Sequence, residues 1–171
     1  MIDDSLFVAR GPDLPPIVAE VTVPTDRHAA FFALATEDGL EAWLGRRSLV
    51  DLRIGGAYEI YFDGDQPPGL RGSEGCQILA YVPGEMLAVS WNAPPTLPAA
   101  RAKRAWAVFS FTPVDEGTRV RVTHLGLGQD GEWPAVRAYF ERAWPRFLNA
   151  LAEHMHAKQA HPEGSTAPRE R

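Results

Sequence analysis

The stretch WPAVRAYFERAWPRFLNALAEHMHAK, residues 133–158, decides the fold. Large apolar side chains recur along it at steps of three and four residues: Val136, Phe140, Trp144, Phe147, Leu148, Leu151 and Met155. This spacing is typical of an amphipathic helix with one apolar face. We expect such a helix from about Pro134 to Lys158. Its apolar face needs a surface to pack against, so the rest of the chain must supply one.

Pro145 lies inside this predicted helix. A proline removes one backbone N–H donor and its ring clashes with the carbonyl four residues earlier, here that of Glu141. We therefore expect a kink or a break between Glu141 and Pro145.

The preceding residues alternate between apolar and polar side chains and are interrupted by turn signals, which predicts strands. The expected strands lie at 17–23, 48–54, 57–62, 73–81, 85–91, 102–112 and 118–127. Two short helices are expected between the first two strands: one capped by Thr25 and ending at Ala35, and one from Thr36 or Asp38 to Leu44. The predicted fold class is α+β, with a curved seven-stranded antiparallel sheet wrapped over the C-terminal helix.

Gly55-Gly56 suits a two-residue hairpin turn between the second and third strands. With that turn, Arg53 would lie opposite Tyr58 and Asp51 opposite Ile60. An arginine in this position could bind a ligand carboxylate. The alternative is that Asp51 and Arg53 form a structural ion pair or a solvated face.

A chain of 171 residues is long enough for one buried core and short for two. We expect a flexible N-terminal extension at 1–14, a single domain at 15–158 and a disordered tail at 159–171. The net charge of −5 and the absence of a Lys/Arg run argue against nucleic-acid or membrane binding. Cys76 is the only cysteine, and we see no signal sequence or membrane span, so we expect a cytoplasmic protein.

The order of strand, two helices, six strands and long helix resembles the helix-grip fold of the START-like (SRPBCC) superfamily. Three fragments narrow the resemblance to the activator of Hsp90 ATPase homologue family (AHSA1): DLRIGG at 51–56, GCQILAYVPGEMLAVSW at 75–91 and FTPVDEGTRVRVTH at 111–124, followed by the late Trp144. The sequence departs from the family pattern at Ala143, where glycine is common. The eukaryotic activator stimulates Hsp90 through a separate N-terminal domain, for which we find no room here. We therefore do not expect the Hsp90 interaction to carry over.

A cavity between sheet and helix would be lined by inward-facing aromatic and polar side chains. The candidate ligand-pocket residues are Trp43, Arg53, Tyr58, Phe62, Gln77, Trp91, Phe109, His124, Phe140 and Trp144. Packing alone would also explain most of the aromatic ones.

Some polar residues invite a chemical interpretation. His124 shares strand parity with Val120 and Val122, so it is expected to face inward as a polar anchor, a general base or a satisfied core residue. Glu74 could position a ligand or lie exposed beside a loop. We expect no metal site and no cofactor, because the histidines lack ligand spacing and the glycine-rich stretch near Gly126 lacks a phosphate-binding motif.

Our first functional hypothesis is non-catalytic binding of a small apolar or amphipathic molecule in the cavity, with loops 65–71 and 93–102 as its rim. The second is a cyclase-like or hydratase-like enzyme in which two of His124, Arg53 and Glu74 converge on that cavity. The third is a protein-interaction module, a homodimer or a chaperone-associated adaptor, that uses exposed strand edges or an outward-facing Trp106.

Overall fold

The computed structural model describes Ser5, Phe7 and residues 14–161. The strands are β1 (Ile17–Val23), β2 (Ser48–Val50), β3 (Tyr58–Ile60), β4 (Ile78–Val82), β5 (Met86–Trp91), β6 (Ala105–Val114) and β7 (Gly117–Leu125). The helices are α1 (Arg27–Ala35), α2 (Glu37–Leu44), α3 (Pro98–Arg101) and α4 (Trp133–Ala160). The predicted α+β fold is confirmed, with two short helices after the first strand and one long helix at the end.

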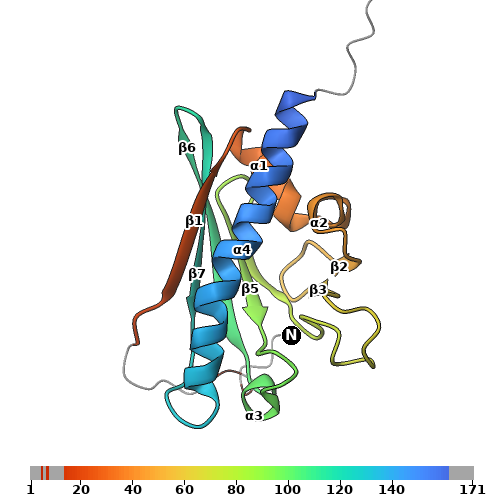
Figure 1. Cartoon of the computed structure of the whole chain (residues 1–171), viewed down its shortest axis with the longest axis vertical. Helices are drawn as coiled ribbons and strands as arrows, with labels where there is room; N and C mark the ends of the chain where they lie inside the picture. Colours follow the sequence, from red (N-terminus) through yellow and green to blue (C-terminus); the bar gives the residue numbers. More distant parts are fainter. Residues whose placement is uncertain (1–4, 6, 8–13, 162–171) are drawn as a thin grey trace, which may run out of the picture.

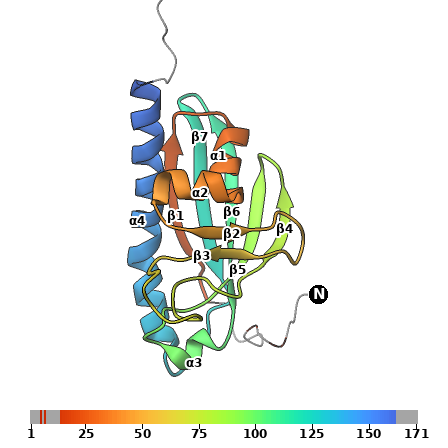
Figure 2. The same cartoon turned by 90° about the vertical axis from the view of Figure 1, so that its right-hand side faces the viewer.

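The strands form a five-stranded antiparallel sheet in the order β1-β7-β6-β5-β4 and a separate β2-β3 ladder. Helix α4 runs lengthwise along the sheet, while α1, α2 and the β2-β3 ladder lie beside it (Figures 1 and 2). Inward-facing side chains of the central strands, such as Phe109 on β6 and Val122 on β7, are fully buried. The core therefore lies between the sheet and this layer of helices and short strands.

The seven predicted strands do not form one continuous sheet, and the hairpin predicted between the second and third strands is not closed by a two-residue turn. Val50 pairs with Tyr58 and Ser48 with Ile60, so residues 51–57 form the connection and the register expected for Arg53 is wrong. The backbone of Gly55 and Gly56 instead exchanges hydrogen bonds with Ile78, at 2.8 and 2.9 Å. These bonds tie the β2-β3 ladder to the start of β4.

Helix α4 is one continuous helix from Trp133 to Ala160 with Pro145 inside it, so of the kink or break expected between Glu141 and Pro145 the break is wrong. Pro145 and Glu141 are both exposed, and water can satisfy the Glu141 carbonyl that lacks an N–H partner. Trp144 and Leu148, on either side of the proline, are buried against the sheet. Packing against the sheet therefore supports the helix on both sides of Pro145.

The N-cap of α1 is Asp26 rather than Thr25. The Asp26 carboxylate accepts hydrogen bonds from the backbone N–H groups of His28 and Ala29, at 2.9 and 3.1 Å. The Ala29 bond, with smaller contributions from His28, holds the Asp26 pKa below its usual value. Helix α2 follows directly and ends, as predicted, at Leu44, where Gly45 with a left-handed φ of 61° forms the C-cap.

Other strand boundaries also differ from the sequence prediction, most clearly at the starts of β4 and β6. The prediction places residues 73–77 in the fourth strand, but they form a loop and β4 begins at Ile78. In this loop Ser73 forms hydrogen bonds with Ile60 of β3, and Gln77 forms hydrogen bonds with Ser90 of β5. The predicted loop 93–102 contains a single helical turn, α3, with Pro98 at its start, so β6 begins only at Ala105.

The chain ends lie partly outside the described residues. Of the predicted N-terminal extension only Ser5, Phe7 and Leu14 are described, and Phe7 packs against Trp106 with ring centroids 6.0 Å apart. Helix α4 continues two residues past the predicted Lys158, and positions 162–171 of the predicted tail are not described. No helix in the described part is long and apolar enough to cross a membrane.

Candidate functional site

A cavity of about 860 Å³ lies between α4, the end of β5 and two loops. One loop follows β3 and contributes lining residues from Phe62 to Ser73, and the other follows β5 and contributes residues from Asn92 to Arg101. These are the two loops that the sequence predicted as a rim. The volume is within the range of small-molecule binding sites.

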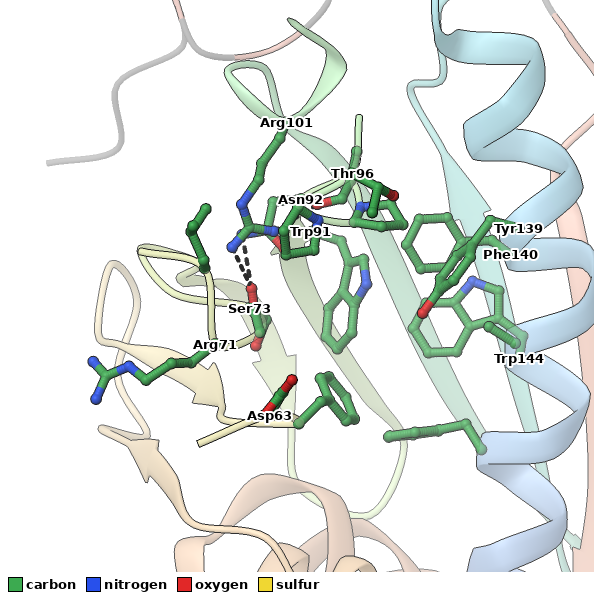
Figure 3. A pocket seen from close by; sticks show the side chains of 18 of the residues that line it. Asp63, Arg71, Ser73, Trp91, Asn92, Thr96, Arg101, Tyr139, Phe140 and Trp144 are labelled. Carbon is green, nitrogen blue, oxygen red and sulfur yellow. Dashed lines mark hydrogen bonds between the residues drawn. The ribbon is translucent and has the colours of Figure 1, made fainter. Parts of the chain in front are cut away.

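The base of the cavity is aromatic (Figure 3). Trp91 at the end of β5 lies beside Trp144 of α4, with ring centroids 5.0 Å apart. Phe140 and Phe147, one turn before and after Trp144 on the same helix face, lie 5.7 and 5.5 Å from its ring. Sheet and helix thus present one continuous aromatic surface to the cavity.

His124 lies under this surface and fixes Trp144. Its Nδ1 accepts the indole N–H of Trp144 at 3.0 Å, so a neutral ring carries its proton on Nε2. That Nε2 atom is buried and has no partner among the described residues. Burial, with a smaller contribution from the Arg137 charge, lowers the His124 pKa to about 3. The ring is therefore neutral near pH 7 and acts as a hydrogen-bond acceptor for the cavity wall.

The cavity opens to solvent where three large apolar residues remain exposed. Phe62, Leu70 and Tyr139 have 38%, 41% and 44% of their surface accessible, and all three line the cavity. Exposed apolar side chains around a concave apolar interior are typical of a binding-site entrance.

Arg101 holds the two rim loops together. Its guanidinium reaches from α3 to the carbonyl oxygens of Gly69, Gly72 and Ala93, with shortest distances of 2.7, 2.7 and 2.6 Å (Figure 3). All of these acceptors are backbone carbonyls, and no carboxylate forms an ion pair with Arg101 within the described ranges. Burial lowers the Arg101 pKa, and the neighbouring Arg104 charge lowers it further, while the Glu74 carboxylate acts in the opposite direction.

The loop before β4 is ordered by polar contacts rather than by strand pairing. The Glu74 carboxylate accepts hydrogen bonds from the backbone and the guanidinium of Arg71 at 2.6–2.8 Å. Burial alone would raise the Glu74 pKa, but hydrogen bonds from Gly69 and Arg71 lower it overall. Gly72 approaches β3 so closely that an added Cβ would lie 1.9 Å from the Ile60 carbonyl oxygen, which requires glycine there.

The structure brings four of the ten predicted pocket residues to the cavity: Phe62, Trp91, Phe140 and Trp144. Four others pack behind the aromatic surface or beside it: Trp43, Tyr58, Phe109 and His124. Tyr58 and Trp43 are also fixed by hydrogen bonds to backbone carbonyls in α1, at 2.8 and 2.9 Å.

Gln77 and Arg53 are not in the cavity lining. Gln77 donates its amide N–H to the Gly55 carbonyl at 2.9 Å and so supports the loop before β4. Arg53 is 71% exposed and pairs with Asp51, the structural alternative that the sequence left open. It lies outside the cavity because residues 51–57 form a wide connection instead of a tight turn.

Sequence reasoning missed several lining residues, including Arg101, Arg142 and Arg146, Tyr139, Ala143 and Ala150. Among these residues, only Ala143 and Ala150 could have been predicted from the sequence, because small residues beside large apolar ones on a helix face leave room for another group. The place of the three arginines in the lining could not be predicted, because nothing in their spacing distinguishes them from arginines on a solvated surface.

The side chains considered for catalysis do not converge. Arg53 pairs with Asp51 and Glu74 with Arg71, while His124 lies beneath Trp144, and none of the three lines the cavity. Cys76 is buried outside the lining, where desolvation raises its pKa to about 11. Across the described residues, no group of three or more His, Cys, Asp or Glu is placed to hold a metal ion. Trp106 is half-buried rather than openly exposed.

An antiparallel sheet that holds a long C-terminal helix, with a pocket between them, defines a helix-grip protein of the START-like class. Residues 24–156 match the family described as Activator of Hsp90 ATPase homolog 1-like protein, and the chain belongs to this family. A search of curated proteins found no match.

Solved structures with the same fold come from several bacteria. Protein NE0264 from Nitrosomonas europaea is 16% identical, with a TM-score of 0.65 over 86% of this chain and 97% of that one. An AHSA1-like protein from Rhizobium etli is 20% identical, with a TM-score of 0.59 over 91% of each chain. The Aha1 dimer from Colwellia psychrerythraea is 18% identical, with a TM-score of 0.60 over 83% of this chain and 96% of that one. At these identities the likeness shows the fold alone.

Proposed function

We propose that this protein binds a small apolar or amphipathic molecule in the cavity between α4 and the sheet, without transforming it chemically. The observation that carries the proposal is the cavity of about 860 Å³ with its aromatic base formed by Trp91, Phe140, Trp144 and Phe147. Burying an apolar ligand against such a surface contributes roughly 25 cal/mol per Å² of apolar area removed from water.

The polar groups in the lining support binding rather than catalysis. The Ser73 hydroxyl accepts the Ile60 N–H at 2.8 Å and lies 3.4 Å from the Tyr58 carbonyl, so it is committed to the backbone. The Asp63 carboxylate accepts the Gln66 amide at 3.0 Å. No histidine or cysteine lines the cavity in the part of the chain that the structure describes. The lining thus offers no paired nucleophile and base.

Ala143 gives a direct test, since it lies in the lining beside Trp144. Ala143→Phe should occupy the part of the cavity beside Trp144 and weaken binding of an apolar probe by about tenfold or more, because the ring takes the space in which the ligand lies on the aromatic base. Ala157→Phe, at an exposed position of α4 outside the lining, is the matched control. Native mass spectrometry of the purified protein, followed by titration of the molecule it retains or of naphthalene derivatives, measures the effect.

Circular dichroism and the unfolding midpoint establish that both variants are folded. Equal binding by wild type and Ala143→Phe, or no binding of any probe by wild type, contradicts the proposal.

A second proposal concerns assembly. The relative from Colwellia psychrerythraea is described as a dimer, and we infer that this chain also forms a homodimer. Light scattering after size-exclusion chromatography should give twice the chain mass of 18.8 kDa. The monomer mass would contradict the inference.

A cytoplasmic location and the lack of an Hsp90 interaction stay predictions, and a pull-down with Hsp90 tests the second of these.

A further inference from the structure

The cavity lining is strongly cationic in an otherwise acidic chain. Its charged side chains in the described structure are four arginines, Arg71, Arg101, Arg142 and Arg146, and one acid, Asp63. The whole chain has a formal net charge of −5. Positive charge is therefore concentrated at the cavity, and this local excess needs its own explanation.

Arg71 does not contribute to the excess. It forms an ion pair with Glu74 at 2.6 Å and stacks on the Tyr61 ring at 4.6 Å. Figure 3 shows its side chain pointing away from the cavity. The cations that remain are Arg101 on one wall and Arg142 and Arg146 on the other.

The guanidinium of Arg101 has no ion-pair partner in the described ranges, and one of its N–H donors has no acceptor there. A guanidinium group carries five N–H donors. Four of those of Arg101 are used: Nε–H and one Nη2–H for the Gly69 carbonyl, the other Nη2–H for Gly72, and one Nη1–H for Ala93. The second Nη1–H is free for a further acceptor. Carbonyl oxygens do not neutralise the charge. Arg101 therefore adds positive charge to its wall of the cavity, although it forms no ion pair in the described ranges.

Arg142 and Arg146 are exposed and lie four residues apart on α4, so they are neighbours on the helix surface. Like charges at this spacing repel and destabilise a helix by a few tenths of a kcal/mol. Neither arginine has an ion-pair partner in the described chain; the nearby Glu141 pairs instead with Arg137 at 3.6 Å. An anion held between the two guanidinium groups would relieve their repulsion and could accept charge-assisted hydrogen bonds.

We propose that the ligand is an organic anion: a flat apolar body that lies on the aromatic base of the cavity, joined to a carboxylate or phosphate that Arg142 and Arg146 hold at the rim opposite Arg101. This inference rests on the proposed binding function and specifies its ligand class. The aromatic surface supplies affinity for the apolar body, and the arginines select for the negative charge.

Three probes with the same ring system test the inference: naphthaleneacetate, naphthyl phosphate and the neutral naphthaleneacetamide. Binding is followed by isothermal titration calorimetry with the full-length wild type. We expect at least one anion to bind about tenfold more tightly than the amide, with a preference that decreases as salt is added. Whichever anion binds better identifies the head group.

The double variant Arg142→Gln/Arg146→Gln should lose most of this preference while still binding the amide as wild type does. Both positions are exposed, so the variant is expected to fold. Arg119→Gln, which removes an exposed arginine on β7 outside the cavity lining, should keep the full preference.

The outcomes separate this inference from the proposed function. Equal affinity for the amide and both anions, or a preference that survives in the double variant, overturns the anion site and leaves ligand binding intact. Failure of all three probes to bind overturns both.

Discussion

Among the residues that the structure describes, the hydrogen bond from Trp144 to His124 is the single side-chain hydrogen bond that joins the middle of α4 to the central sheet. His124 is almost fully buried, and its ring lies edge-on to Phe140 at 4.7 Å. A charged imidazolium in this position would lose its hydration and could no longer accept the indole N–H at Nδ1. The orientation of Trp144, and so the shape of the cavity, depends on a neutral histidine.

This gives a pH prediction. The His124 pKa is about 3 in the folded protein and near 6.5 when unfolded. Between these values the unfolded chain binds a proton that the folded chain does not, so the free energy of unfolding falls as pH decreases below about 6.5. The loss from this residue is on the order of a few kcal/mol by pH 3 to 4. Urea unfolding at a series of pH values measures it.

His124→Gln keeps an acceptor for the Trp144 indole but does not titrate, so its stability should depend less steeply on pH between about 4 and 6.5. His156→Gln, at an exposed position of α4, should follow the wild-type profile. Identical slopes for wild type and His124→Gln would show that His124 is not the buried neutral group described above.

At the scale of elements, α4 contains two prolines in different settings. Pro134 lies in the first turn, where no N–H donor is needed, while Pro145 lies in the interior and leaves the Glu141 carbonyl without an intrahelical partner. Pro145→Ala should therefore stabilise the protein by about 1–3 kcal/mol. Pro134→Ala should change stability by less than about 0.5 kcal/mol. Denaturant unfolding measures both.

A Pro145→Ala variant that is no more stable than wild type would mean that the proline is accommodated at no cost.

Element prediction from sequence succeeded where periodicity was long and failed where loops made tertiary contacts. The repeat from Val136 to Met155 is sufficient to predict α4, and alternation is sufficient for β1, β5, β6 and β7. The connection at 51–57 was misread because a Gly-Gly pair serves a tight turn as well as a close approach to another strand. Here Gly55 and Gly56 bond to Ile78, a contact that no local pattern reveals.

The candidate site was predictable only in part for a related reason. Strand parity indicates that Phe109 and His124 face inward, but it does not say how many side chains lie between them and the cavity. Both are covered by Trp144. Residues on the rim, such as Arg101, come to the site through loop packing and are invisible to periodicity.

At the scale of the whole molecule, the central claim is that the space between α4 and the sheet is a ligand site. Side chains elsewhere between α4 and the sheet are largely buried. Beside the end of β5, by contrast, two loops that Arg101 joins border an open cavity. The protein therefore combines a packed core with an open aromatic pocket that its own side chains do not fill.

The five tryptophans report on this claim because they are distributed over the molecule. Trp91 and Trp144 line the cavity, Trp43 lies behind it, Trp106 packs with Phe7 on the other side, and Trp133 begins α4. Each has one indole N–H signal in a nitrogen–proton correlation spectrum.

The most direct measurement is to follow these five signals by NMR while naphthaleneacetate is added to the protein. The pocket predicts that the signals of Trp91 and Trp144 shift in a saturable manner with a common dissociation constant, while that of Trp106 does not move. Saturable shifts centred on Trp106, or five signals that do not change, would contradict the assignment of a ligand site between the helix and the sheet.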